Sequence, residues 1–169
     1  MQYMSKIRSA SSFQSNATAT GFWFGMAVGR GVLGFLTGRI GEFNAVISYI
    51  AISLFLELIF WLVPSLIISS VSVAFLGIFL GPLFPTAMVF VSKLMPKHLA
   101  VGSVGFAAAF GGSGGAIFPF IVGAIAQAKG VKSLQPVILA LLVVIALLWF
   151  LLRGPEKRWR EAQRSLDNI

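Results

Sequence analysis

Apolar residues fill this chain in five long runs, which short polar stretches separate. A bilayer core about 30 Å thick needs about 20 helical residues, because only a closed backbone hydrogen-bond pattern is stable in lipid. The runs therefore predict five membrane-spanning helices. These lie at residues 17–37, 45–63, 65–94, 99–126 and 136–152.

Composition supports the same class of protein. Of the 169 residues, 57% are hydrophobic and 11% are charged, and the mean hydropathy of +0.92 exceeds that of ordinary globular domains. We expect an all-α, polytopic transmembrane helix bundle surrounded by membrane lipid. The chain has no cysteine, which excludes disulfides and cysteine metal sites, and no cofactor is expected.

The net charge of +8 would suit a nucleic-acid-binding protein, but the basic residues stand at the ends of apolar runs and do not gather on one face. Nucleic acid is therefore not an expected partner. Eight fall on one side of the five-helix region 17–152 and four on the other, which predicts a cytosolic C-terminal tail, 153–169, and a non-cytosolic segment, 1–16. The cellular membrane stays open. The two sets are Arg39, Lys93, Lys97, Arg153, Lys157, Arg158, Arg160 and Arg164, against Lys6, Arg8, Lys129 and Lys132.

Glycines and prolines mark two of the runs. The first spaces Gly21, Gly25 and Gly29 four apart, so that another helix can approach closely. The third is about ten residues longer than a perpendicular span requires, and its "GIFLGPLFP" stretch predicts a kink, because proline cannot donate to an upstream helical carbonyl.

The fourth run carries "AAAFGGSGGAIFPF", for which two compatible interpretations exist. Small residues permit tight packing between helices. A flexible, partly unwound helix beside a solvent pathway is the functional interpretation, since such interruptions mark binding regions in transporters.

Arg30 lies nine residues, or about 13 Å, inside the first run from Arg39. At the bilayer centre an arginine costs at least about 2.5 to 3.5 kcal/mol, so it needs a polar partner. In an antiparallel hairpin Glu57 lies within about 6 Å of the depth of Arg30. We expect an Arg30–Glu57 ion pair, with a proton-coupling or substrate role as the alternative.

Three stretches carry a resemblance to the major facilitator superfamily: "GFWFGMAVGRGVLGFLTGRIGE", "LGPLFPTAMVFVSKLMPKHL" and "GFAAAFGGSGGAIFPFIVGAIAQAKGVKSLQPVILALLVV". Within it the chain resembles the fungal bypass-of-stop-codon branch and, more distantly, the fucose permeases. The resemblance implies twelve helices in two bundles, of which this chain matches the last five. The superfamily's cytosolic loop motif corresponds here to Gly34, Arg39 and Gly41, but its acid and its trailing basic pair are missing.

Two hypotheses for function follow. In the first, the chain is the C-terminal part of a secondary transporter that carries a small solute by alternating access, and its partner is a missing N-terminal half. In the second, it is a non-transporting interaction module that pairs with a full-length transporter or with itself. No nucleophile triad, acid/base pair or phosphate loop suggests an enzyme. Candidate cavity-lining residues are Phe84, Pro85, Met88, Phe110, Ser113, Phe118 and Gln127.

Overall fold

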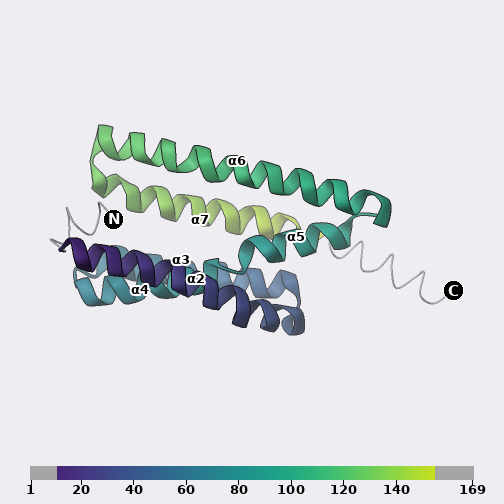
Figure 1. The fold of residues 1–169 in the computed structure, drawn as a ribbon, viewed down its shortest axis with the longest axis horizontal. Coiled ribbons are helices and arrows are strands. Elements are labelled where there is room, and N and C mark those ends of the chain that lie inside the picture. The colour runs from purple at the N-terminus through teal and green to yellow at the C-terminus, as the bar shows by residue number, and fades with distance from the viewer. Residues whose placement is uncertain (1–10, 155–169) are drawn as a thin grey trace.

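The computed structural model describes residues 11–154, and this part of the chain is helical apart from short connections (Figure 1). The predicted segment 1–16 and tail 153–169 therefore lie mostly outside the described residues. The elements in chain order are α2 (Ser12–Ile40), α3 (Glu42–Leu62), α4 (Leu66–Leu80), α5 (Leu83–Leu94), α6 (Lys97–Lys129), the 3-10 helix η1 (Val131–Ser133) and α7 (Leu134–Leu151).

All five predicted spans are confirmed as helices long and apolar enough to cross a membrane. Helix α2 begins five residues before the predicted boundary because Ser11 and Gln14 form a capping box. The backbone N–H of Gln14 donates to the Ser11 Oγ at 3.3 Å, and the backbone N–H of Ser11 donates to the Gln14 Oε1 at 2.9 Å.

The start of α2, which Ser11 caps, and the end of α7, next to Arg153, lie at opposite ends of the bundle (Figure 1). The α3–α4 turn and Gly130 lie at the end that holds Ser11, which we call the Ser11 end. Gly41 and the connection between α5 and α6 lie at the other, the Arg153 end. Among the described basic residues, Arg39, Lys93 and Arg153 stand at the Arg153 end, whereas Lys129 and Lys132 stand at the Ser11 end.

The third span is broken where the sequence predicts a kink. Helix α4 ends at Leu80, Gly81 and Pro82 form a turn, and α5 begins at Leu83. The chain keeps its helical direction, since the Gly81 N–H still donates to the Gly77 carbonyl oxygen at 2.9 Å and the Thr86 N–H to that of Pro82 at 3.0 Å. The break thus divides one long span into two helices that meet at a proline.

Helices α2 and α4 interlock through glycines on both sides. A Cβ added at Gly25 would lie 2.3 Å from the Ala74 carbonyl oxygen, and one added at Gly77 would lie 2.2 Å from the Phe22 carbonyl oxygen. Only a hydrogen fits in these gaps. The predicted close approach is confirmed at Gly25 and Gly29, and α4, not the sequence neighbour α3, supplies the facing row. At Gly34 and Gly38, the later glycines of the same predicted row, it is not found, because an added Cβ would meet nothing within 4 Å.

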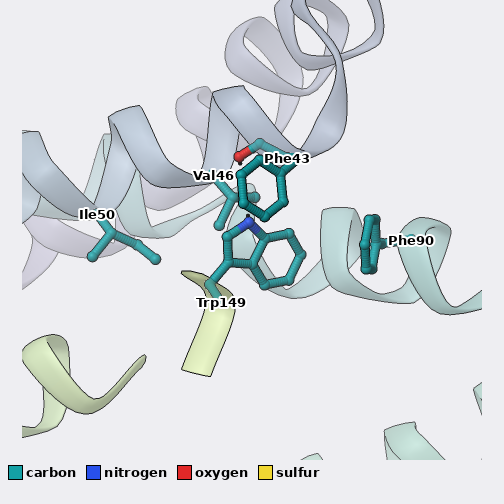
Figure 2. Packing of buried hydrophobic residues seen from close by; sticks show 5 residues of the cluster. All are labelled: Phe43, Val46, Ile50, Phe90 and Trp149. Carbon is teal, nitrogen blue, oxygen red and sulfur yellow. Dashed lines mark hydrogen bonds between the residues drawn. The ribbon is translucent and has the colours of Figure 1, made fainter. Parts of the chain in front are cut away.

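The main apolar core joins α3, α5 and α7 at the Arg153 end (Figure 2). The Trp149 indole stacks on Phe43, with ring centroids 6.3 Å apart, and lies 5.1 Å from the Phe90 ring. Its Nε1–H donates to the Phe43 carbonyl oxygen at 3.3 Å. Val46 and Ile50 of α3 complete the cluster, which anchors α7 to the broken span.

Helix α6 lies on the outside and packs mainly against α5 and η1 (Figure 1). It runs unbroken through its glycine-rich stretch and through Pro119, so the expected unwinding is not seen. The expected tight packing is not seen within this chain either, because a Cβ at Gly112 or Gly115 would meet nothing within 4 Å. Gly111 is the exception, since a Cβ there would lie 3.1 Å from the Phe84 ring of α5, and the rest of this glycine-rich stretch stays open to other elements of the described chain.

Candidate functional site

Arg30 caps the proline break. Pro82 and Pro85 have no N–H, so the carbonyl oxygens four residues earlier, on Ile78 and Gly81, lose their helical donors. The Arg30 Nε donates to the Gly81 oxygen at 3.3 Å. Gly29 lies against the Ile78 oxygen, which a Cβ would approach to 2.0 Å. Two adjacent residues of α2 therefore cover both freed carbonyls.

The structure does not bring Arg30 to Glu57. Gly81, which holds the guanidinium, lies 16 residues after Ser65, or about 24 Å along α4. Glu57 lies six residues before Val63 on α3, about 9 Å from the same turn. The two positions thus differ by about 15 Å in depth. Helix α2 packs on α4 along its length, and this register decides where the arginine can reach.

Glu57 instead belongs to a group of buried polar side chains in the interior of the bundle. It is 2% exposed, and its Oε1 accepts no hydrogen bond. Ser53, one turn earlier on α3, is fully buried, and its hydroxyl is also unpartnered. Gln135 of α7 is 2% exposed and has an unpartnered Oε1. Buried polar atoms without partners are rare, so these positions are candidates for a bound species.

The cavity-lining candidates lie on α5 and α6, and most of them are exposed in the described chain. Phe84, 51% exposed on α5, lies against Gly111 of α6, where an added Cβ would be 3.1 Å from its ring. Phe110 and Phe118 are exposed on α6, and the Ser113 hydroxyl donates to the Ala109 carbonyl oxygen of its own helix at 2.7 Å. The remaining candidates are Pro85 and Gln127, which are exposed, and Met88, which is half-buried.

Of the loop-motif residues, Arg39 and Gly41 stand at the Arg153 end, at the α2–α3 connection, whereas Gly34 lies inside α2. Gly34 touches no other element within 4 Å of an added Cβ. The Arg39 guanidinium lies 4.9 Å from the Phe35 ring centroid, and Gly41, with φ of 95°, ends α2. Next to it Glu42 forms a salt bridge with Lys93 of α5, which ties this connection to the broken span.

A groove of about 340 Å³ lies between the first turns of α2 and α4, and no sequence pattern predicted it. Apolar side chains line most of it. The hydroxyls of Thr18 and Ser70, 2.9 Å apart, hydrogen bond within it. This bond joins α2 to α4 beyond the reach of the glycine rows.

Sequence reasoning missed the Glu42–Lys93 pair and Gln135. The first joins residues 51 apart on different helices, and no local spacing indicates it. For Gln135 a signal exists. It stands seven residues before Leu142 and fourteen before Trp149, and all three side chains are buried. A polar residue in register with a buried heptad row is an identifiable interior position.

These helices define a multi-pass α-helical membrane protein. The sequence model of the Major Facilitator Superfamily matches residues 1–168, and the chain belongs to that superfamily, whose members are transporters and not enzymes. Over 161 residues it is 34% identical to Bypass of stop codon protein 6 of Saccharomyces cerevisiae (strain ATCC 204508 / S288c), a match that covers 88% of this chain and 32% of the yeast protein. The chain thus spans about a third of that relative, and no solved structure matches it.

Proposed function

We propose that this chain forms the C-terminal part of a secondary transporter that moves a small solute by alternating access. The open side of α5 and α6 carries the proposal. Phe84, Phe110 and Phe118 are each at least half exposed there, and a Cβ added at Gly112 or Gly115 would meet nothing within 4 Å. In a complete transporter of this superfamily, a second bundle would face this side. Solute would then pass between the two.

The break between α4 and α5 supports movement of that side. Helix α5 is tied to the rest of the bundle by Lys93 and by the Phe90–Trp149 contact, both beyond the Gly81–Pro82 turn. A helix hinged at a proline tilts without breaking further backbone hydrogen bonds, because the donors are already absent. We expect α5 and α6 to change tilt together when access alternates.

A test of transport uses proteoliposomes with two compositions. One contains this chain alone, and the other contains it with a separately expressed N-terminal portion of the yeast relative that it does not cover. Uptake of labelled sugars, amino acids, organic acids and short peptides is measured in both. We expect uptake of one class in the paired vesicles, and we expect Ser113→Trp on the open face to lower it. Val101→Trp, an exposed change outside the candidate set, is the matched control.

An interaction module is the alternative, and the uncovered face of α6 is the observation that favours it. If the chain binds the full-length relative or itself, yet the paired vesicles take up no solute, the alternative replaces the transporter proposal. If the paired vesicles take up solute and Ser113→Trp reduces that uptake, the interaction-module alternative is excluded.

Orientation is part of the proposal. The excess of Lys and Arg at the Arg153 end favours placing that end in the cytosol. Because the chain has no cysteine, single thiols report the side directly. In intact cells a membrane-impermeant maleimide should label Lys132→Cys but label Met95→Cys only after permeabilisation. The reverse pattern would invert the topology.

A further inference from the structure

Helices α3 and α7 each carry a heptad row of buried residues, and the rows meet where Trp149 contacts Phe43. On α3 the buried residues Phe43, Ile50 and Glu57 are spaced by seven. On α7 the buried residues Gln135, Leu142 and Trp149 have the same spacing. A spacing of seven keeps side chains on one helix face, so each row forms a continuous seam.

The register of the two seams follows from one contact. The helices are antiparallel and in contact, and the Trp149 Nε1–H donates to the Phe43 carbonyl oxygen (Figure 2). From Phe43 to Glu57 is 14 residues, and from Trp149 back to Gln135 is also 14, about 21 Å in each case. Glu57 therefore lies level with Gln135, as Ile50 lies level with Leu142.

The side chains at the depth of Glu57 and Gln135 carry oxygen atoms, and none of them is cationic. Glu57 Oε1, Gln135 Oε1 and the Ser53 Oγ are all buried without a hydrogen-bond partner. Helices α4 and α7 contain no titratable residue. Of the charged groups on the other elements that pack on α3, Arg30 binds the Gly81 carbonyl, Arg39 lies over Phe35, and Lys93 pairs with Glu42. Arg153, just after α7, lies over the Phe43 ring at the far end of α3 from Glu57.

An ionised carboxylate inside a membrane span is strongly unfavourable without a positive partner. A proton removes the charge and also turns one Glu57 oxygen into a hydrogen-bond donor, for which the Gln135 Oε1, an unpartnered acceptor at the same depth, is the candidate. The Ser53 hydroxyl, one turn away on α3, can then donate to the second Glu57 oxygen. One proton would thus serve Glu57, Gln135 and Ser53. The Ser69 hydroxyl of α4, within about 3 Å of Glu57 in depth, is a further buried atom without a partner.

We propose that Glu57, Gln135 and Ser53 form a proton-binding site inside the bundle, in which the Glu57 carboxyl carries the proton. Proton binding here stands on the structure alone. Its use as the coupling ion for solute movement rests on the proposed transport function.

Infrared spectroscopy of the full chain in lipid nanodiscs tests the site without any solute. The chain has only five acidic residues, so the carbonyl stretch of a protonated carboxyl is readily assigned. At neutral pH we expect this band in the wild-type protein, with a shift in heavy water. Glu57→Gln, which keeps the size of the side chain, should remove it. Glu42→Gln, which changes the acidic residue that pairs with Lys93, should leave this band in place.

Gln135→Leu provides a second test that leaves the carboxyl in place. Because its acceptor is lost, the Glu57 band should move to higher wavenumber. Circular dichroism and elution volume report whether each variant folds. A wild-type protein without the band, a band that survives Glu57→Gln, or a band unmoved in Gln135→Leu would overturn the proposal. So would loss of the band when sodium chloride replaces choline chloride, since a metal cation would then occupy the site. Absence of solute uptake would contradict only the transport function.

Discussion

Rows of glycines occur on α2 and on α6, and only the row on α2 is packed against another described helix. On α2, a Cβ at Gly25 or Gly29 would lie 2.3 or 2.0 Å from a carbonyl oxygen of α4. On α6, a Cβ at Gly112 or Gly115 would meet nothing within 4 Å. The difference lies in the partner. Helix α4 presents Gly77 and Gly81 at the same spacing of four, whereas no described helix presents a matching row to α6. A small-residue row therefore permits close approach, and the facing helix decides whether it occurs.

The largest expected effect contrasts two aromatic side chains, one in each region. Trp149 is 8% exposed and joins three helices, whereas Phe120 on α6 is 79% exposed. Trp149→Ala should lower the free energy of unfolding by about 3 kcal/mol, because a cavity replaces the indole contacts. Phe120→Ala should leave it nearly unchanged, since this mostly exposed side chain makes few contacts within the described chain. Titration with a denaturing detergent measures both, and equal losses would erase the contrast.

The glycine rows themselves come next. Gly29→Ala forces backbone apart at the α2–α4 crossing and should lower the free energy of unfolding by about 1 to 3 kcal/mol. Gly112→Ala meets open space and should leave stability unchanged or raise it by up to about 1 kcal/mol, since alanine favours helix. The melting temperatures of the two variants check this, and a stable Gly29→Ala protein would refute the interlock.

A smaller effect tests how α2 covers the proline break. Arg30→Met removes the donor to the Gly81 oxygen and should lower stability by about 1 kcal/mol. In the Pro85→Ala background the new N–H of residue 85 can take its place, so the same change should matter less. A double-mutant cycle should give a coupling of about 0.5 to 1.5 kcal/mol. A coupling of zero would mean that Arg30 does not donate a hydrogen bond to the Gly81 oxygen.

The smallest effect concerns the Glu42–Lys93 pair, where the lysine is 53% exposed. Glu42→Gln should lower stability by less than about 1 kcal/mol, because solvent screens exposed ion pairs. The loss should shrink further at high ionic strength. Thermal unfolding at low and high salt measures the difference, and a loss that is insensitive to salt would argue for a role other than charge pairing.

Local patterns predicted much of the fold, because they depend on residues close in sequence. The spans follow from run length, and the α4–α5 break follows from two prolines that cannot donate. The partner of Arg30 did not follow. The hairpin estimate compared depth along α2 and α3 alone, whereas α2 packs along α4 and offers its arginine to a backbone oxygen there.

Local sequence patterns also could not predict that Glu57 and Gln135 lie at the same depth in the bundle. Each residue belongs to a heptad row that the sequence displays, but 78 positions separate them. Only the Trp149–Phe43 hydrogen bond sets the register between the two helices.

By itself the sequence determined that the described part of the chain has five helices able to span a membrane, where the third span breaks, and which helix faces are small enough for close packing. The reasons are that a backbone in lipid must form its own hydrogen bonds, which favours helix, and that proline has no N–H to donate. Tertiary structure alone decided which glycine row is filled, what Arg30 binds and which polar side chains share a level. Those outcomes depend on the order in which helices lie side by side and on their register, and no single run of residues encodes either.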